Sequence, residues 1–138
     1  MGESQAHHDL VQRTYRYIRE RFPPDRGFAI FLDAPGTLRR DKPGRLHGFV
    51  PDVLAVDVPT TVHVVGEAKT AEDLGRPHTT AQLRAYLRHL RILGGGILVI
   101  SVPWAALRMA RRIVAAAVVS TGATNVEIVV LDDTEPCL

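Results

Sequence analysis

Residues 51–70, PDVLAVDVPTTVHVVGEAKT, decide how this chain folds. Two runs rich in β-branched residues, 52–57 and 62–69, surround a Pro-containing turn at 58–61, and this pattern predicts a β-hairpin. Alternation of side chains along both runs leaves both faces of the hairpin largely apolar. We therefore expect other elements to cover the hairpin on both sides.

The length of the turn determines which residues of the hairpin oppose each other. A four-residue turn places Asp57 opposite Val62, and counting back along both strands places Asp52 opposite Glu67. Directly opposed residues hold their Cβ atoms about 4.5–5.5 Å apart. Because side chains alternate between faces, Lys69 lies on the same face as Glu67. Two carboxylates and one amine are thus expected to converge at the open end of the hairpin.

Two opposed carboxylates repel each other, and burial adds to that cost. A divalent cation with oxygen ligands would offset the repulsion, and Lys69 alone would offset part of it. The alternative is that Asp52, Glu67 and Lys69 are three solvated charges on a wet strand edge. The apolar neighbours of these residues favour the buried arrangement.

The motif Pro51-Asp52, followed fifteen positions later by Glu67-Ala68-Lys69, resembles that of the PD-(D/E)xK nuclease superfamily, whose members share the restriction-endonuclease-like fold. The resemblance implies a metal-dependent phosphodiesterase. It implies that Asp52 and Glu67 bind Mg²⁺ (or Mn²⁺) and that Ala68 offers its backbone carbonyl to the metal. It also implies that Lys69 activates or positions the attacking water.

Residues 79–93 are expected to form a helix with distinct stripes. Three leucines at helical spacing should face the core: Leu83, Leu87 and Leu90. Gln82, Tyr86 and His89 form a neighbouring stripe, and Gln82-x-x-x-Tyr86 resembles the helix motif that follows the catalytic Lys in RecB-like members of the superfamily. That resemblance implies that the pair orients catalytic groups and touches the DNA backbone. The alternative is that both are ordinary helix-surface residues.

The rest of the chain predicts an α/β fold in which helices alternate with strands. The expected elements outside the hairpin are helices at 8–22, 79–93 and 103–120 and strands at 28–32, 97–102 and 126–131. Alternation at the end of the chain implies parallel strands with right-handed crossovers. The resemblance implies an αβββαβ restriction-endonuclease-like core, with a mixed central sheet flanked by helices, plus a C-terminal αβ unit. Residues 1–7 are expected to be disordered, and residues 71–77 are expected to form a loop.

The composition is that of one globular domain spanning residues 1–138, with 46 % hydrophobic and 23 % charged residues. No apolar run reaches the length of about eighteen residues that predicts a transmembrane helix, and residues 1–20 contain no signal-peptide core. The single cysteine, Cys137, predicts neither a disulfide nor a thiolate metal site. We therefore expect a cytoplasmic protein that does not enter a membrane.

The net charge of +2 is unevenly distributed, and fifteen of the seventeen basic residues are arginine. Arginine suits bidentate contacts with phosphate, although its abundance is also typical of proteins from GC-rich genomes. The candidate nucleic-acid-binding residues are Arg39, Arg40, Lys42, Arg45, His47, Arg84 and Arg88. The alternative for Arg84 and Arg88 is a solvated helix face, and Arg108, Arg111 and Arg112 are expected to solvate the last helix.

Glu20 is a further candidate metal ligand, because an acid near the C-terminal end of a helix is disfavoured by the helix dipole and needs another reason to be there. We expect Glu20 to approach Asp52 as an outer ligand, and an ion pair with Arg16 is the alternative. Three histidines are isolated in the sequence and are expected to be structural: His47, His63 and His78.

Together these features predict a small Mg²⁺-dependent deoxyribonuclease that hydrolyses phosphodiester bonds of DNA. Structured or branched DNA is one candidate form of the substrate, and RNA is an alternative. A homodimer is expected because a duplex or junction offers two strands. The competing hypothesis is a non-catalytic nucleic-acid-binding or scaffold subunit of a defence or mobile-element system.

Overall fold

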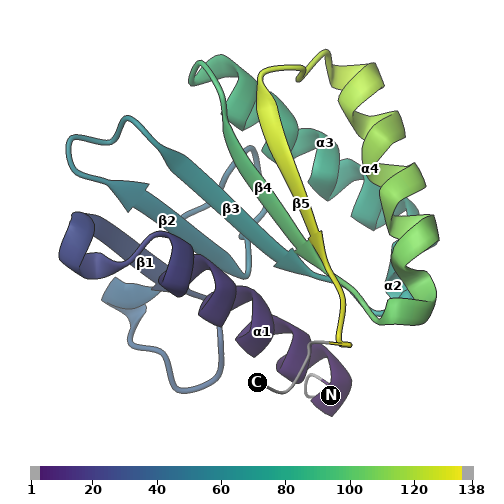
Figure 1. Cartoon of the computed structure of the whole chain (residues 1–138), viewed down its shortest axis with the longest axis horizontal. Helices are drawn as coiled ribbons and strands as arrows, with labels where there is room; N and C mark the ends of the chain where they lie inside the picture. The colour runs from purple at the N-terminus through teal and green to yellow at the C-terminus, as the bar shows by residue number, and fades with distance from the viewer. Residues whose placement is uncertain (1–3, 135–138) are drawn as a thin grey trace.

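The computed structural model describes residues 4–134, which form a five-stranded mixed sheet flanked by helices (Figure 1). The strands are β1 (Phe28–Leu32), β2 (Val53–Asp57), β3 (His63–Ala68), β4 (Gly96–Ser101) and β5 (Val126–Leu131), and they lie side by side in chain order. β2 pairs antiparallel with both β1 and β3. β3, β4 and β5 are parallel, as the alternation of elements predicted. Residues 1–3 and Cys137 lie outside the described residues.

The helices are α1 (Gln5–Arg21), α2 (Ala71–Leu74), α3 (Pro77–Ile92) and α4 (Leu107–Thr121). Three short 3₁₀ turns join the larger elements: η1 (Pro24–Arg26), η2 (Arg39–Asp41) and η3 (Trp104–Ala106). Within residues 4–134, no helix is both long enough and apolar enough to cross a membrane.

The register of the central hairpin is the predicted one. β2 and β3 pair with Val53 opposite Gly66, and continuing this register by one residue places Asp52 opposite Glu67. At the turn, the Asp57 N–H donates to the carbonyl of Val62, the residue expected to oppose it, at 3.3 Å. The hairpin therefore presents its two carboxylates at one end, as the turn length indicated.

The hairpin is buried on both faces, as its apolar pattern predicted. One face packs against α1, where Ile18 and Phe22 meet Val53 and Val64. The other face packs against α3 and α4 in the larger core. Figure 1 shows α1 crossing one side of the sheet and α3 with α4 on the far side and the edge.

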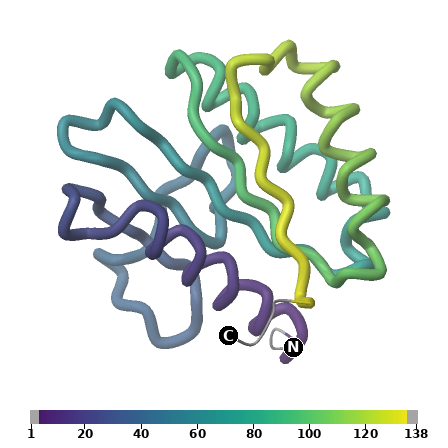
Figure 2. Tube along the Cα trace, viewed as in Figure 1, coloured from purple at the N-terminus to yellow at the C-terminus, as the bar shows by residue number. Residues whose placement is uncertain are grey.

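Gly66 lets α1 approach the sheet closely. A Cβ at this position would lie 2.7 Å from both Ile18 Cδ1 and Thr14 Cγ2, so only glycine fits without a shift. The Thr14 hydroxyl also hydrogen bonds to Ser101 Oγ of β4 at 2.7 Å, in a buried contact. These contacts fix α1 so that its N-terminal end lies beside the carboxyl ends of the parallel strands (Figure 2).

Helix caps account for the elements that the sequence analysis placed wrongly. α1 begins at Gln5 rather than at residue 8, because the Ser4 hydroxyl accepts a hydrogen bond from the His7 N–H at 3.1 Å. Residues 5–7 are therefore helical, in contrast to the disorder expected for them. The loop expected over residues 71–77 contains α2, which Thr70 caps in the same way.

Candidate functional site

Asp52 and Glu67 form a buried acidic pair at the end of the hairpin. Asp52 is 9 % exposed and Glu67 is 2 % exposed, so the interpretation of this end as a wet strand edge is wrong. Asp52 Oδ2 accepts a hydrogen bond from the Ala68 N–H at 2.8 Å, which holds the carboxylate against β3. Because the hairpin register continues past the last paired residues, the Ala68 N–H lies beside Asp52 and can donate to it.

Burial disfavours the charged form of both acids. It raises the pKa of Asp52, and it raises the pKa of Glu67 well above the ordinary range, with the charge of Asp52 adding to the effect on Glu67. The amine of Lys69 acts in the opposite direction on both carboxyl groups, but more weakly than burial. Without a further cation, the pair therefore favours holding a proton.

The two oxygens of Glu67 differ in their surroundings. Oε1 accepts a hydrogen bond from the hydroxyl of Tyr86 at 3.3 Å. Oε2 is buried and accepts from no N–H or hydroxyl donor within residues 4–134, and a proton held by the pair would join the carboxyl groups of Asp52 and Glu67 in its place. Buried carboxylate oxygens are nearly always paired, so an open Oε2 beside Asp52 is the feature of this site that most needs a ligand.

Gln82 and Tyr86 reach the site from α3. Gln82 is 8 % exposed and Tyr86 is fully buried, so the alternative of ordinary helix-surface residues is wrong. The half-buried amine of Lys69 donates a hydrogen bond to Gln82 Oε1. The four-residue spacing thus places one side chain on the amine of Lys69 and the other on the carboxylate of Glu67.

His7 is a member of the site that the sequence analysis did not identify. Its Nε2 lies 3.2 Å from the carbonyl oxygen of Ala68 and 3.8 Å from Asp52 Oδ2. The resemblance had assigned that same carbonyl to the metal. The signal that could have found His7 is Ser4, a preferred N-cap residue that extends the helix back over it.

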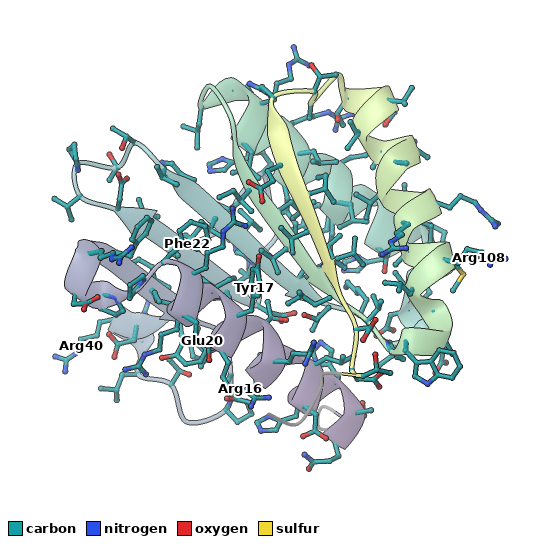
Figure 3. The ribbon with its side chains drawn as sticks, viewed as in Figure 1. Arg16, Tyr17, Glu20, Phe22, Arg40 and Arg108 are labelled. Atoms are coloured by element: carbon teal, nitrogen blue, oxygen red, sulfur yellow. The ribbon has the colours of Figure 1, made fainter. Side chains whose placement is uncertain are left out.

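Glu20 does not reach the acidic pair. It is exposed, and it lies about 20 Å along α1 from His7 at roughly 1.5 Å of rise per residue. Figure 3 shows it with Arg16 on the outer side of the helix. The expected approach of Glu20 to Asp52 is therefore wrong, because the opposite end of α1 faces the carboxylates.

Part of the predicted nucleic-acid-binding set gathers in one place. His47, Arg84 and Arg88 line a pocket of about 290 Å³ together with Phe49, between the loop before β2 and the exposed side of α3. Within residues 4–134, neither arginine has an ion-pair or hydrogen-bond partner. Two unpaired guanidinium groups one helical turn apart repel each other slightly, and an anion in the pocket would relieve that repulsion.

The other basic candidates lie outside this pocket. Arg39 and Arg40 are exposed in η2, and Figure 3 shows Arg40 at the edge of the molecule. Lys42 Nζ lies 4.0 Å from Asp33 Oδ1, and Arg45 donates to the carbonyl of Gly48 at 3.2 Å. These four side chains are placed along one loop rather than around one ligand.

Two of the histidines expected to be isolated belong to a cluster. The ring of His89 lies 5.5 Å from that of His47 and 6.1 Å from that of His63. Burial, followed by the charges of its two neighbours, lowers the pKa of His89. His78 packs instead against Phe49, at 5.4 Å between ring centroids.

No three His, Cys, Asp or Glu side chains among residues 4–134 are arranged as a ready set of metal ligands. The acidic pair could still hold Mg²⁺, which binds through one or two carboxylates and keeps several waters or substrate oxygens. The unpartnered Glu67 Oε2 and the adjacent Asp52 fit that requirement.

Comparison of the chain with protein-family models, with curated proteins and with solved structures finds no match. The interpretation of the site therefore depends on its residues and their geometry.

Proposed function

We propose that this chain is a divalent-metal-dependent nuclease that hydrolyses phosphodiester bonds of DNA, built on a restriction-endonuclease-like topology. The order of elements supports the topology, because α1 is followed by three antiparallel strands, then by α3 and the parallel β4, and last by α4 with β5. The acidic pair lies where the carboxyl end of β3 meets the parallel half of the sheet. In open α/β sheets this is the edge at which ligands bind.

The observation that carries the proposal is the buried acidic pair with its open Glu67 Oε2. A fold that only needed stability would gain nothing from two facing carboxylates without full hydrogen bonding. Asp52 and Glu67 would hold the cation, and His7 Nε2 lies 3.8 Å from Asp52 Oδ2, where it can interact with that carboxylate. When bound, Mg²⁺ or Mn²⁺ would supply Lewis-acid activation of water and of the phosphoryl oxygens.

Lys69 supplies positive charge at the same end of the hairpin. Gln82 accepts a hydrogen bond from its amine, which fixes the amine against α3 at a position from which its charge acts on both carboxyl groups. A fixed amine stabilises negative charge that develops on a phosphoryl oxygen, and it can take part in proton transfer. Tyr86 holds Glu67 Oε1, which leaves Oε2 as the oxygen open to a ligand.

The pocket of Arg84, Arg88 and His47 supports DNA as the ligand. Phe49 lines this pocket, its ring lies 6.5 Å from that of Tyr86, and Tyr86 contacts Glu67. A DNA strand passing from this pocket to the acidic pair would place phosphates against both arginines. In this proposal the exposed side chains of Arg84 and Arg88 bind DNA, and the buried Asp52 and Glu67 carry out the chemistry.

Cleavage of labelled single-stranded, duplex and branched DNA, with Mg²⁺ and with EDTA, tests the proposal. The wild-type protein should cleave at least one form only with the metal, and Lys69→Ala should abolish cleavage without abolishing binding. Lys42→Ala, which removes the chain's other lysine, is the matched control and should lower affinity more than the cleavage rate. DNA binding without cleavage of any form would instead favour the non-catalytic nucleic-acid-binding subunit.

A further inference from the structure

Trp104 is the chain's one tryptophan, and it is 64 % exposed. It opens η3, two residues beyond the end of β4, and its backbone N–H donates to Asp133 Oδ1 at 2.8 Å. An exposed indole offers a large flat apolar surface that is suited to contact with a partner. The hydrogen bond to Asp133 anchors the backbone of Trp104 to the segment after β5.

Trp104 lies at the same edge of the sheet as the acidic pair. Ser101, the last residue of β4, pairs with Ala68, which directly follows Glu67. Neighbouring strands are about 4.8 Å apart, and three further residues span at most about 10 Å. The backbone of Trp104 is therefore within roughly 15 Å of Ala68, which is at most about four nucleotides at the stacked spacing of 3.4 Å and fewer in an extended single strand.

Two arginines accompany the indole. A shallow pocket of about 540 Å³ lies at the start of α4, and its lining includes Trp104, Leu107, Arg108 and Arg111. Neither guanidinium makes a salt bridge or a hydrogen bond within residues 4–134, although the charge of Arg111 helps to lower the pKa of Asp132. Figure 3 shows Arg108 extending from α4 into solvent. The sequence analysis assigned both arginines to solvation of the helix, which leaves their position beside an exposed aromatic ring unexplained.

We propose that this surface, formed by Trp104, Arg108 and Arg111, binds an unpaired DNA strand, with a base stacked on the indole and phosphates on the guanidinium groups. An exposed aromatic ring with neighbouring cations is the arrangement by which proteins hold single strands, since every base offers a flat face. A paired base offers no free face to Trp104. The inference extends the proposed function by naming the substrate class, namely DNA with an unpaired segment within about four nucleotides of the scissile bond.

The single tryptophan gives a direct measurement of stacking. In EDTA, where no metal-dependent cleavage occurs, a twelve-nucleotide oligo-dT should quench the Trp104 fluorescence, whereas an abasic oligomer of equal length should bind without comparable quenching. Fluorescence anisotropy of labelled oligo-dT should show affinity for Trp104→Ala lower by about 5- to 150-fold, the range expected for one stacked base. Trp104→Phe should retain most of the affinity.

Val119→Ala is the control, because Val119 is 83 % exposed near the far end of α4, the helix that carries Arg108 and Arg111, and it should leave the affinity unchanged. Alanine at both Arg108 and Arg111 should reduce the salt slope of oligo-dT binding by up to about 1.4 units, at roughly 0.7 per phosphate contact. Because Trp104 is exposed, its variants should keep the wild-type melting temperature.

Equal affinity of wild type and Trp104→Ala for oligo-dT, or bound oligo-dT without quenching, would overturn the inference. A dimer that dissociates on Trp104→Ala, with oligo-dT affinity unchanged, would assign the surface to a second copy of the chain. Since the titration uses no metal, it is independent of cleavage. If the protein cleaves DNA but Trp104→Ala leaves the oligo-dT affinity unchanged, only this inference is refuted. If oligo-dT quenches the Trp104 fluorescence but no DNA is cleaved, only the proposed nuclease activity is refuted.

Discussion

Replacing Glu67 with Gln should change how the stability of the metal-free protein depends on pH. Burial and the charge of Asp52 hold the pKa of Glu67 well above its ordinary value of 4.5, so the folded protein keeps a proton that the unfolded chain releases. A group whose pKa is raised in the folded state contributes its full stabilisation below the unfolded pKa of 4.5. That stabilisation is lost as the pH rises through the pKa of the folded state. Glu67→Gln keeps the shape of the side chain and removes this titration.

The magnitude follows from one proton. Each proton retained by the folded state and released on unfolding costs about 1.4 kcal/mol of stability for each unit of rising pH. Urea unfolding in EDTA between pH 5 and 7 should therefore show wild type losing up to about 2.7 kcal/mol relative to Glu67→Gln across that range. The oxygen of the Gln side chain can still accept from Tyr86, so the comparison isolates the charge.

Glu127→Gln is the matched control for this measurement. Glu127 is exposed and bonded to Arg21, which lowers its pKa, so its contribution to stability is full above the ordinary value and is lost only as the pH falls. The difference in free energy of unfolding between Glu127→Gln and wild type should be constant between pH 5 and 7. If the Glu67→Gln difference is also constant, Glu67 does not retain a proton in the folded state, and the account of the acidic pair is wrong.

Three other changes have distinct expected outcomes. Gly66→Ala should destabilise the protein by about 1–3 kcal/mol in urea unfolding, because its Cβ would lie 2.7 Å from side-chain atoms of α1, and an unchanged midpoint would contradict that packing. Tyr86→Phe should cost about 1 kcal/mol by the same assay, since it removes the hydroxyl that donates to Glu67; no loss would show that the bond contributes nothing. Alanine at both Arg84 and Arg88 should lower the salt slope of duplex binding by about two units, and an unchanged slope would return both residues to a solvated face.

Local rules were sufficient to predict the hairpin and its acidic pair. The turn length set the register, so the opposition of Asp52 and Glu67 could be counted from the sequence alone. The four-residue spacing of Gln82 and Tyr86 likewise placed both on one side of α3, and their burial toward the site follows from the neighbouring leucines. These inferences needed only the period of a strand or a helix.

Long-range packing decided what could not be predicted. Which end of α1 faces the carboxylates depends on the close approach at Gly66, and this packing selects His7 and excludes Glu20. His47, His63 and His89 come from three separate segments of the chain, so the spacing of residues within one element could not predict that they cluster. Such contacts come from the folded topology rather than from any single element.

Calorimetric titration of the metal-free protein with Mn²⁺ tests the central claim most directly, because it measures whether the acidic pair holds a divalent cation. Wild type should bind Mn²⁺ saturably, and the heat should vary with the ionisation enthalpy of the buffer, since the ion displaces the proton that the pair retains. Glu67→Gln should lose this binding while staying folded, and Glu127→Gln should keep it. Saturable binding that is the same in wild type and Glu67→Gln, or no binding by wild type, would contradict the assignment of Asp52 and Glu67 to a metal site.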